Sequence, residues 1–292
     1  MLEWQHCPPT HSDRTALKTT LPHTTLPTRL CRLARMGWRF LIGFSILAFR
    51  YTRLSPAQQT AVTTRWCRQL LATLALEVRV SGQLPATQPG NTLLVSNHVS
   101  WLDIIALAAY TPPRFVAKRE IRGWPVIGWM VARGGTLFID RTNRRDASRV
   151  NQVMAESLRR GDCLCVFPEG TTTTGHHLLP FKSSLFESAL LAGSTVQPVT
   201  LRYLDERGEV TTAPSYAGDT TFWQSLASLL KLRKVVVEVH YGQPLTAGQE
   251  PLMTRFELSE AARHDIAGHL KQWLDTPDTQ ARTAGDPQVE AP

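Results

Sequence analysis

The sequence lacks the features by which several protein classes are recognised. Its apolar run at residues 40–49 has only ten residues, too few to span a bilayer. The run starts far from the N-terminus and no small-residue cleavage site follows it before Arg50, so we expect no secretory signal. No Gly-x-Ser-x-Gly segment occurs, which excludes the nucleophile elbow of the α/β-hydrolases. No internal repeat is visible.

Cysteine is scarce and is not arranged for metal binding. The neighbouring residues His176 and His177 have no third ligand at a suitable spacing, so we expect no metal site. We interpret the five cysteines as reduced, structural thiols; they are Cys7, Cys31, Cys67, Cys163 and Cys165.

Acidic residues are almost absent from one window of the chain. Between Arg29 and Arg79 there are nine arginines and a single acid, Glu77, so this window alone accounts for the formal net charge of +8. A basic patch can bind nucleic acid or anionic lipid, and the apolar run within the window favours lipid. We therefore expect an anionic membrane surface as a partner, and no nucleic acid.

Two amphipathic helices are expected at residues 29–76. The first contains the apolar run, with Trp38 and Tyr51 beside it as aromatics suited to a headgroup boundary. The second begins at Ser55 and Pro56, a cap followed by proline at the first helical position. Basic amphipathic helices are typical of interfacial anchors, although packing on a domain requires the same apolar face. We expect peripheral or monotopic attachment to the cytoplasmic face of the inner membrane.

The length of the chain, 292 residues, fits one catalytic-sized domain with extensions at both ends, and we expect an α/β domain at residues 77–274. Short β-rich runs alternate there with helical patterns, which indicates a mixed, largely central sheet flanked by helices. Strands are expected at 77–80, 93–96, 114–117, 137–139, 164–167, 196–203 and 235–240, with helices at 145–160 and 254–274. The buried face expected for the last helix is Phe256, Ala262, Ile266, Leu270 and Trp273.

The two ends of the chain, residues 1–28 and 275–292, are polar and show little periodicity, so we expect both to be disordered. Met36 directly precedes the first apolar segment and is a second candidate translation start.

The most informative residue is His98, which lies at an expected strand-to-helix junction, five positions before the carboxylate of Asp103. Imidazole is the side chain whose ordinary pKa lies nearest to neutral pH. A carboxylate on one ring nitrogen fixes the tautomer that leaves the other nitrogen free as a base. Ser100 and Asp103 also have the spacing of a helix capping box, which is the alternative interpretation of the same residues.

A polar loop at residues 168–175 follows another expected strand and holds one carboxylate, four hydroxyls and two glycines. Glu169 can accept a hydrogen bond from a glycerol hydroxyl, and the glycines let backbone amides approach a ligand closely. A polar surface turn has the same composition. Elsewhere, Arg141 can bind a phosphate or pair with Asp140. Lys118 and Lys182 are further cations that fit a binding site or a solvated surface.

The order and spacing of these pieces resemble the glycerophospholipid acyltransferase family, most closely its bacterial 1-acyl-sn-glycerol-3-phosphate (lysophosphatidic acid) acyltransferases. The resemblance covers about residues 93–199. Its four blocks are Asn97-His98-x-x-x-x-Asp103, Gly135-x-x-Phe138-Ile139-Asp140-Arg141, Phe167-Pro168-Glu169-Gly170-Thr171 and Val196-x-Pro198-Val199.

This resemblance implies an O-acyltransferase with the glycerolipid acyltransferase fold. His98 would deprotonate a hydroxyl of a lysophospholipid, most directly 1-acyl-sn-glycerol-3-phosphate, and Asp103 would orient His98. The oxygen would attack an acyl thioester, acyl-CoA or acyl carrier protein, to give phosphatidic acid without an acyl-enzyme or a cofactor. The substrate contacts implied are Arg141 for phosphate, Glu169, Gly170 and Thr171 for the acceptor pocket, and Lys118 and Lys182.

One position departs from the commonest family pattern. Many lysophosphatidate enzymes have an arginine after Glu-Gly-Thr, whereas this chain has Thr172. A hydroxyl cannot supply the charged, paired contacts of an arginine, so a lyso-ornithine lipid is an alternative acceptor. A hydrolase would use the same base to activate water, and a non-catalytic membrane-binding protein would need only the basic helices. The apolar stretch 121–130 fits an acyl channel, a lipid contact or an ordinary core segment.

Overall fold

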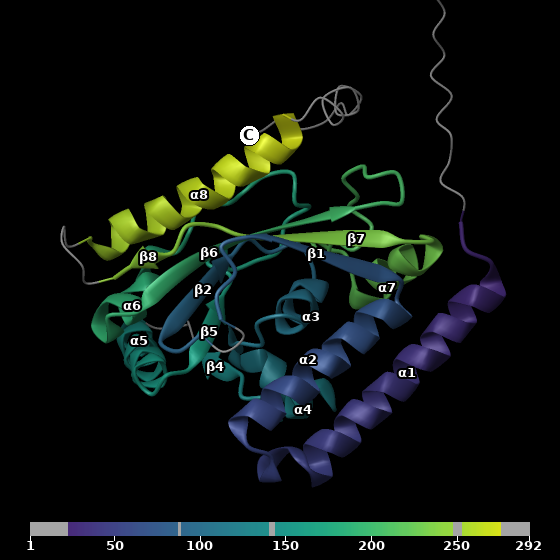
Figure 1. Cartoon of the computed structure of the whole chain (residues 1–292), viewed down its shortest axis with the longest axis horizontal. Coiled ribbons are helices and arrows are strands. Elements are labelled where there is room, and N and C mark those ends of the chain that lie inside the picture. Colours follow the sequence, from purple (N-terminus) through teal and green to yellow (C-terminus); the bar gives the residue numbers. More distant parts are fainter. Residues whose placement is uncertain (1–22, 87–88, 140–143, 248–252, 276–292) are drawn as a thin grey trace, which may run out of the picture.

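Alternating buried strands and amphipathic helices build a layered α/β/α arrangement in this computed structural model (Figure 1), which describes residues 23–86, 89–139, 144–247 and 253–275. The strands are β1 Leu76–Gly82, β2 Thr92–Ser96, β3 Arg114–Lys118, β4 Leu137–Ile139, β5 Cys163–Val166, β6 Thr195–Leu204, β7 Val235–Tyr241 and β8 Leu245–Thr246. The helices are α1 Leu26–Phe49, α2 Pro56–Thr73, α3 Leu102–Ala108, α4 Ile127–Arg133, α5 Arg144–Arg159, α6 Glu187–Ala192, α7 Phe222–Lys231 and α8 Arg255–Asp275. Short 3-10 turns occupy Tyr51–Arg53, Arg119–Gly123 and Ser183–Phe186.

The sheet has the strand order β1-β7-β6-β2-β5-β3-β4, with the short β8 paired to β6. The pairs β6 with β2, β2 with β5, β5 with β3 and β3 with β4 are all parallel. The strand β7 runs antiparallel to β6, and β1 runs parallel to β7. The carboxyl ends of β2, β3, β4, β5 and β6 therefore meet at one edge of the sheet, where ligands bind in open α/β folds.

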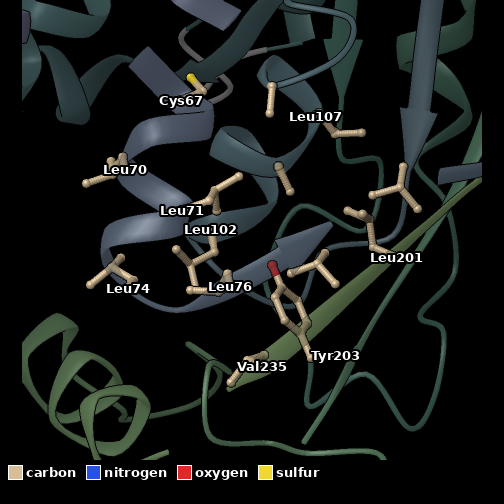
Figure 2. Packing of buried hydrophobic residues seen from close by; sticks show 14 of the residues in the cluster. Cys67, Leu70, Leu71, Leu74, Leu76, Leu102, Leu107, Leu201, Tyr203 and Val235 are labelled. Carbon is tan, nitrogen blue, oxygen red and sulfur yellow. The ribbon is translucent and has the colours of Figure 1, made fainter. Parts of the chain in front are cut away.

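Successive side chains of the central strands enter opposite cores, because a strand alternates its faces. Leu94 and Cys165 join the layer that contains α2, α3 and α7, whereas Leu93 and Leu164 join the layer that contains α5, α6 and α8. Figure 1 shows α8 on one side of the sheet and α1 and α2 on the other. Each fully buried leucine stabilises the fold by about 1.5–3 kcal/mol. Figure 2 shows ten labelled residues of the first core, among them Leu70 and Leu71 of α2 and Leu102 of α3.

The helix α1 begins at Leu26, three residues before the expected boundary at residue 29. Its start is held by Thr24, whose backbone N–H donates to Lys231 O at 2.9 Å and whose hydroxyl donates to Leu230 O at 2.6 Å. Residues 23–28 therefore belong to the folded chain, and residues 1–22 lie outside the described part. Within residues 23–275 as described, no helix is both long and apolar enough to cross a membrane.

The helix α2 starts with the expected cap at Ser55, whose side chain accepts from Gln58 N while the Gln58 side chain accepts from Ser55 N. It packs against α1 through Trp66, whose indole N–H donates to Arg39 O at 2.8 Å. The ring leaves no room for a side chain at Gly43, because a Cβ there would lie 2.7 Å from Trp66 Nε1. This close approach fixes how the two helices cross.

The seven expected strands are confirmed, with ends that differ by at most two residues. The helices α4, α6 and α7 and the strand β8 were not expected. The buried face of α8 was wrong at Phe256, which is 59% exposed, because Leu258 instead continues the four-residue spacing of the buried Ala262, Ile266 and Leu270. The side chain of Trp273 lies outside the described part. The stretch 121–130 is not simply core, since Trp124 is exposed while Met130 is buried.

Candidate active site

The expected contact between His98 and Asp103 is present at the carboxyl end of β2. The Nδ1 atom of His98 lies 2.7 Å from Asp103 Oδ2, and the carboxylate is completely buried. Because a carboxylate accepts, Nδ1 carries the proton and donates it to this bond. The Nε2 atom then presents a lone pair, and none of the described residues hydrogen-bonds to it. The His98 side chain is 19% exposed, so part of the ring can be reached from outside the core.

Asp103 is held from several directions in the first turn of α3. Its Oδ2 also accepts from the backbone N–H groups of Val99, at 2.7 Å, and Ser100, at 2.9 Å. Half of the capping box is therefore formed. The other half differs from the expected pattern, because the Ser100 hydroxyl accepts from the N–H of Leu102 at 3.3 Å rather than from that of Asp103, while it donates to Pro214 O at 2.5 Å. The local turn thus orients the carboxylate toward His98.

The imidazole ring is also fixed in its plane. Phe167, which directly follows β5, stacks on it with ring centroids 3.9 Å apart and an interplanar angle of 13°. Phe115 of β3 lies parallel to Phe167, with centroids 6.3 Å apart. A ring covered on one face and hydrogen-bonded at Nδ1 has little freedom to rotate, which keeps Nε2 pointing in one direction.

Glu169 holds the turn that carries His98. One carboxylate oxygen accepts from the His98 backbone N–H at 2.8 Å, and the other accepts from Leu179 N at 2.9 Å. Burial raises the pKa of Glu169, and the two backbone donors partly offset this rise. Gly170 follows with a φ of +76°, a left-handed conformation that glycine adopts without strain and that turns the chain sharply.

The threonine-rich loop is bonded to the His98 turn and to a second loop. Thr173 N donates to His98 O at 2.8 Å, and the Thr172 hydroxyl donates to the carbonyl of Tyr216. Tyr216 N in turn donates to Val99 O at 3.0 Å. Gly175 has a φ of +87°, and a Cβ there would lie 3.2 Å from Val99. Three chain segments are thereby tied around the imidazole.

Lys118 and Lys182, which were expected to bind substrate, are exposed side chains outside the bonded group around His98 and Asp103. Lys118 ends β3 at the same sheet edge as His98, and its side chain is exposed. Lys182 is also exposed, and its backbone N–H donates to Pro168 O at 3.0 Å, next to Glu169. Thr171 is exposed beside Gly170. Arg141 lies outside the described residues. The structure therefore brings together His98, Asp103, Glu169 and Gly170.

No cysteine near the pair is suited to nucleophilic attack. Cys165 of β5 is fully buried, and burial raises the pKa of its thiol well above the ordinary value, so it stays protonated. Burial also raises the pKa of Cys163 to about 12. Among the described residues the cysteines are free thiols, and no cluster of three or more metal-ligating side chains is found. The arrangement can act as a histidine base but not as a cysteine nucleophile.

Two side chains of the site were missed by the sequence argument. Tyr203, the ninth residue of β6, donates its hydroxyl to Asp103 Oδ1 at 2.6 Å. Asn97 bridges the end of β2 to β6, donating to Leu201 O at 2.9 Å and accepting from Leu201 N at 2.8 Å. A tyrosine in an expected buried strand was the available signal, because a buried phenol needs a partner.

Comparison with known proteins places this geometry in a family. A family model described as "Acyltransferase" matches residues 77–202. A 1-acyl-sn-glycerol-3-phosphate acyltransferase of Neisseria meningitidis is 40% identical over 215 residues, 73% of this chain and 83% of the relative. A lyso-ornithine lipid O-acyltransferase of Pseudomonas aeruginosa is 38% identical over 262 residues, 87% of this chain and 97% of the relative.

The fold is also found in a solved structure. The crystal structure of the 1-acyl-sn-glycerophosphate acyltransferase from Thermotoga maritima matches 86% of this chain and 97% of that chain, with a TM-score of 0.63 and 16% identity. The three-layer sheet architecture is therefore shared at low sequence identity. The family model matches this chain, and the relatives align over most of it at close to 40% identity. The chain belongs to the acyltransferase family, as its four motif blocks predicted.

Proposed function

We propose that this acyltransferase moves a fatty acyl group from a thioester to the free hydroxyl of 1-acyl-sn-glycerol-3-phosphate, giving phosphatidic acid. The observation that carries the proposal is the 2.7 Å contact between His98 Nδ1 and Asp103 Oδ2, which leaves Nε2 as an accessible base. The donor is acyl-CoA or acyl carrier protein, and the reaction needs no bound cofactor.

In the proposed reaction, Nε2 of His98 accepts the proton of the acceptor hydroxyl as its oxygen attacks the thioester carbonyl carbon. The carbon–sulfur bond then breaks, the thiolate leaves, and the imidazolium returns the proton to it. Asp103 stabilises the imidazolium that forms between these steps. General-base assistance of this kind contributes about a hundredfold to ten-thousandfold to the rate. Positioning of the two substrates by the surrounding loops supplies the remainder.

Acceptor recognition is proposed for the loop that follows β5. Gly170 and Thr171 lie directly after Glu169, whose carboxylate contacts the backbone of the base. Lys118 and Lys182 are exposed cations on neighbouring segments, and Arg141 comes two residues after the end of β4 in the sequence. Cations at this edge suit a phosphate monoester, which carries a negative charge close to the hydroxyl that reacts.

A second acceptor, lyso-ornithine lipid, is favoured by one observation at Thr172. Its hydroxyl donates to Tyr216 O, so it is engaged within the protein at the position where an arginine would supply charge. The lyso-ornithine lipid O-acyltransferase relative also aligns over 262 residues, against 215 for the 1-acyl-sn-glycerol-3-phosphate acyltransferase. An acceptor with less negative charge would need fewer cations near the base.

Membrane attachment is proposed through α1. Its exposed large apolar side chains fall on one side of the helix at 100° per residue; they are Leu26, Leu30, Trp38, Leu41, Phe44 and Phe49. Arg35 and Arg50 are exposed on the same helix and its end, where they suit anionic headgroups. We propose peripheral association with the cytoplasmic face of the inner membrane, which would place lipid acceptors next to the catalytic edge.

The test is product formation in mixed micelles with a radiolabelled acyl thioester. Purified protein is offered 1-acyl-sn-glycerol-3-phosphate and lyso-ornithine lipid separately. Labelled phosphatidic acid as the preferred product supports the first acceptor, whereas labelled ornithine lipid alone supports the second. Label that is released only as free fatty acid would contradict acyl transfer and indicate a thioester hydrolase.

A further inference from the structure

The Asp103 carboxylate has one more partner, and that partner comes from β6. Tyr203 is 1% exposed, and its hydroxyl donates to Asp103 Oδ1 at 2.6 Å. The other three donors, from His98, Val99 and Ser100, all bind Oδ2. Within the described part of the chain, Tyr203 is therefore the single donor to Oδ1. Figure 2 shows its ring among apolar side chains, with the hydroxyl oxygen on the side of Leu102.

We infer that Tyr203 is a positioning residue for acyl transfer, which fixes the Asp103 carboxylate and sets how strongly its charge acts on His98. The inference rests on the proposed function, in which His98 is the base. It adds to that proposal a residue 100 positions away from Asp103 in sequence. Tyr203 does not touch the substrate and acts only through Asp103.

The phenol is suited to this role because it stays protonated. Burial raises the pKa of Tyr203 well above its ordinary value, and the neighbouring Asp103 charge raises it further. The O–H dipole therefore points its positive end at Oδ1. Since the site is buried, this dipole acts through a low dielectric and is stronger than the same bond in water. This hydrogen bond partly neutralises the Asp103 carboxylate and so weakens its electrostatic effect on His98.

The position of Tyr203 relative to the base is fixed by the sheet. The strands β2 and β6 are parallel neighbours, with Ser96 opposite Val199. One residue after Ser96, the side chain of Asn97 hydrogen-bonds both the N–H and the carbonyl of Leu201. Tyr203 is two residues further along β6, on the same face as Leu201. The turn that carries His98 and the strand that carries Tyr203 are thus held together directly beside Asp103.

The alternative is that Tyr203 merely fills the core, and Tyr241 of β7 is the matched control for this. Tyr241 is also 1% exposed, and its hydroxyl pairs with Thr111 Oγ1 at 3.2 Å rather than with Asp103. Replacing either tyrosine by phenylalanine removes one buried hydroxyl from the same apolar cluster. A purely structural role predicts the same consequences for both changes.

The experiment compares Tyr203→Phe with Tyr241→Phe in the full-length enzyme, measuring kcat and KM across pH in mixed micelles. For Tyr203→Phe we expect kcat to fall by about tenfold to a hundredfold, because a hydrogen bond to a charged group is lost, while the acceptor KM changes little. The acidic limb of the pH–rate profile should move to higher pH, because the full carboxylate charge then holds the proton on His98. Tyr241→Phe should leave the limb in place.

A second change keeps the test valid if Tyr203→Phe fails to fold. Site-specific replacement of Tyr203 by 3-fluorotyrosine preserves shape and makes the phenol a stronger donor, so the acidic limb should move to lower pH. In a double-mutant cycle, Tyr203→Phe should cost less in the Asp103→Asn background than in the wild type. An unmoved limb in the fluorinated protein, or full additivity in the cycle, would overturn the inference.

The variant His98→Ala distinguishes a failure of the proposed base from a failure of the inferred role of Tyr203. If His98→Ala is inactive while the Tyr203 variants keep the wild-type rate and limb, the inference about Tyr203 is overturned and the proposed base stands. If His98→Ala is as active as the wild type, the base itself is wrong and the role of Tyr203 falls with it.

Discussion

The carboxylate of Glu169 accepts a hydrogen bond of 2.8 Å from the backbone N–H of His98. Glu169 therefore contacts His98, the proposed base, through the main chain, from a loop 71 residues further along the sequence. Its other oxygen accepts from Leu179 N at 2.9 Å, which ties the segment after the polar loop to the same side chain. Charge on Glu169 thus affects both the stability of the loop and the placement of the imidazole.

The first prediction concerns the pH dependence that Glu169 gives to stability. Burial raises the pKa of Glu169 above its ordinary value of 4.5, so the folded protein binds that proton more tightly than the unfolded chain does. Its contribution to the unfolding free energy is fully present below pH 4.5 and is lost as the pH rises through the folded pKa. The wild-type value minus the Glu169→Gln value, from urea denaturation, should therefore fall as pH increases above 4.5.

Glu257 provides a control of opposite sign. It is exposed at the start of α8, and hydrogen bonds from the Thr254 backbone and hydroxyl lower its pKa. Its contribution is present above pH 4.5 and is lost as pH falls through the lower folded pKa. The same subtraction for Glu257→Gln should rise with pH. A difference for Glu169→Gln that is flat or rises with pH would show that its carboxylate is not destabilised by burial.

The second prediction concerns the hydrogen bond between the two loops beside His98. Thr172→Val removes the hydroxyl that donates to Tyr216 O and leaves that carbonyl without this donor. We expect kcat/KM for the acceptor to fall by about twofold to tenfold, the usual effect of one neutral hydrogen bond. Thr172→Ser should retain the wild-type value. Thr174→Val, a change of the same kind in the same loop, is the control; equal losses at both positions would exclude a specific role for the Tyr216 bond.

The third prediction concerns the apolar face of α1. Trp38 is 63% exposed and Leu41 is 61% exposed. Insertion of one such side chain into lipid contributes about 1.5–3 kcal/mol, so Trp38→Glu or Leu41→Glu should weaken binding to anionic vesicles by at least about tenfold. Vesicle sedimentation measures this. Phe256→Glu on α8, a residue 59% exposed in the opposite layer, should bind like the wild type. Equal losses at Phe256 would mean that α1 is not the membrane face.

Features encoded locally could be predicted from the sequence. The strands were found because each is a short β-rich run, and the His98 and Asp103 contact was found because the two residues are only five positions apart in the sequence. The capping-box spacing at Ser100 was half correct, because its backbone N–H binds the Asp103 carboxylate while its hydroxyl accepts from Leu102 N and donates to Pro214 O, 114 residues away. Spacing alone cannot anticipate a partner contributed by another loop.

Features that depend on strand order could not be predicted. Tyr203 reaches Asp103 because β6 lies beside β2, and Glu169 reaches His98 because β5 lies on the other side of β2. Periodicity does not specify which strands are neighbours. The error at Phe256 has a different cause, since two overlapping apolar stripes run along α8 and only packing against the sheet selects the one that contains Leu258.

The most direct test of the central claim is the rate of acyl transfer to 1-acyl-sn-glycerol-3-phosphate by His98→Ala, with His176→Ala, an exposed histidine in the acceptor loop, measured in parallel. If His98 is the general base, its replacement should lower kcat by about a hundredfold to ten-thousandfold, and His176→Ala should match the wild type. A His98→Ala enzyme that transfers acyl groups at the wild-type rate would contradict the account.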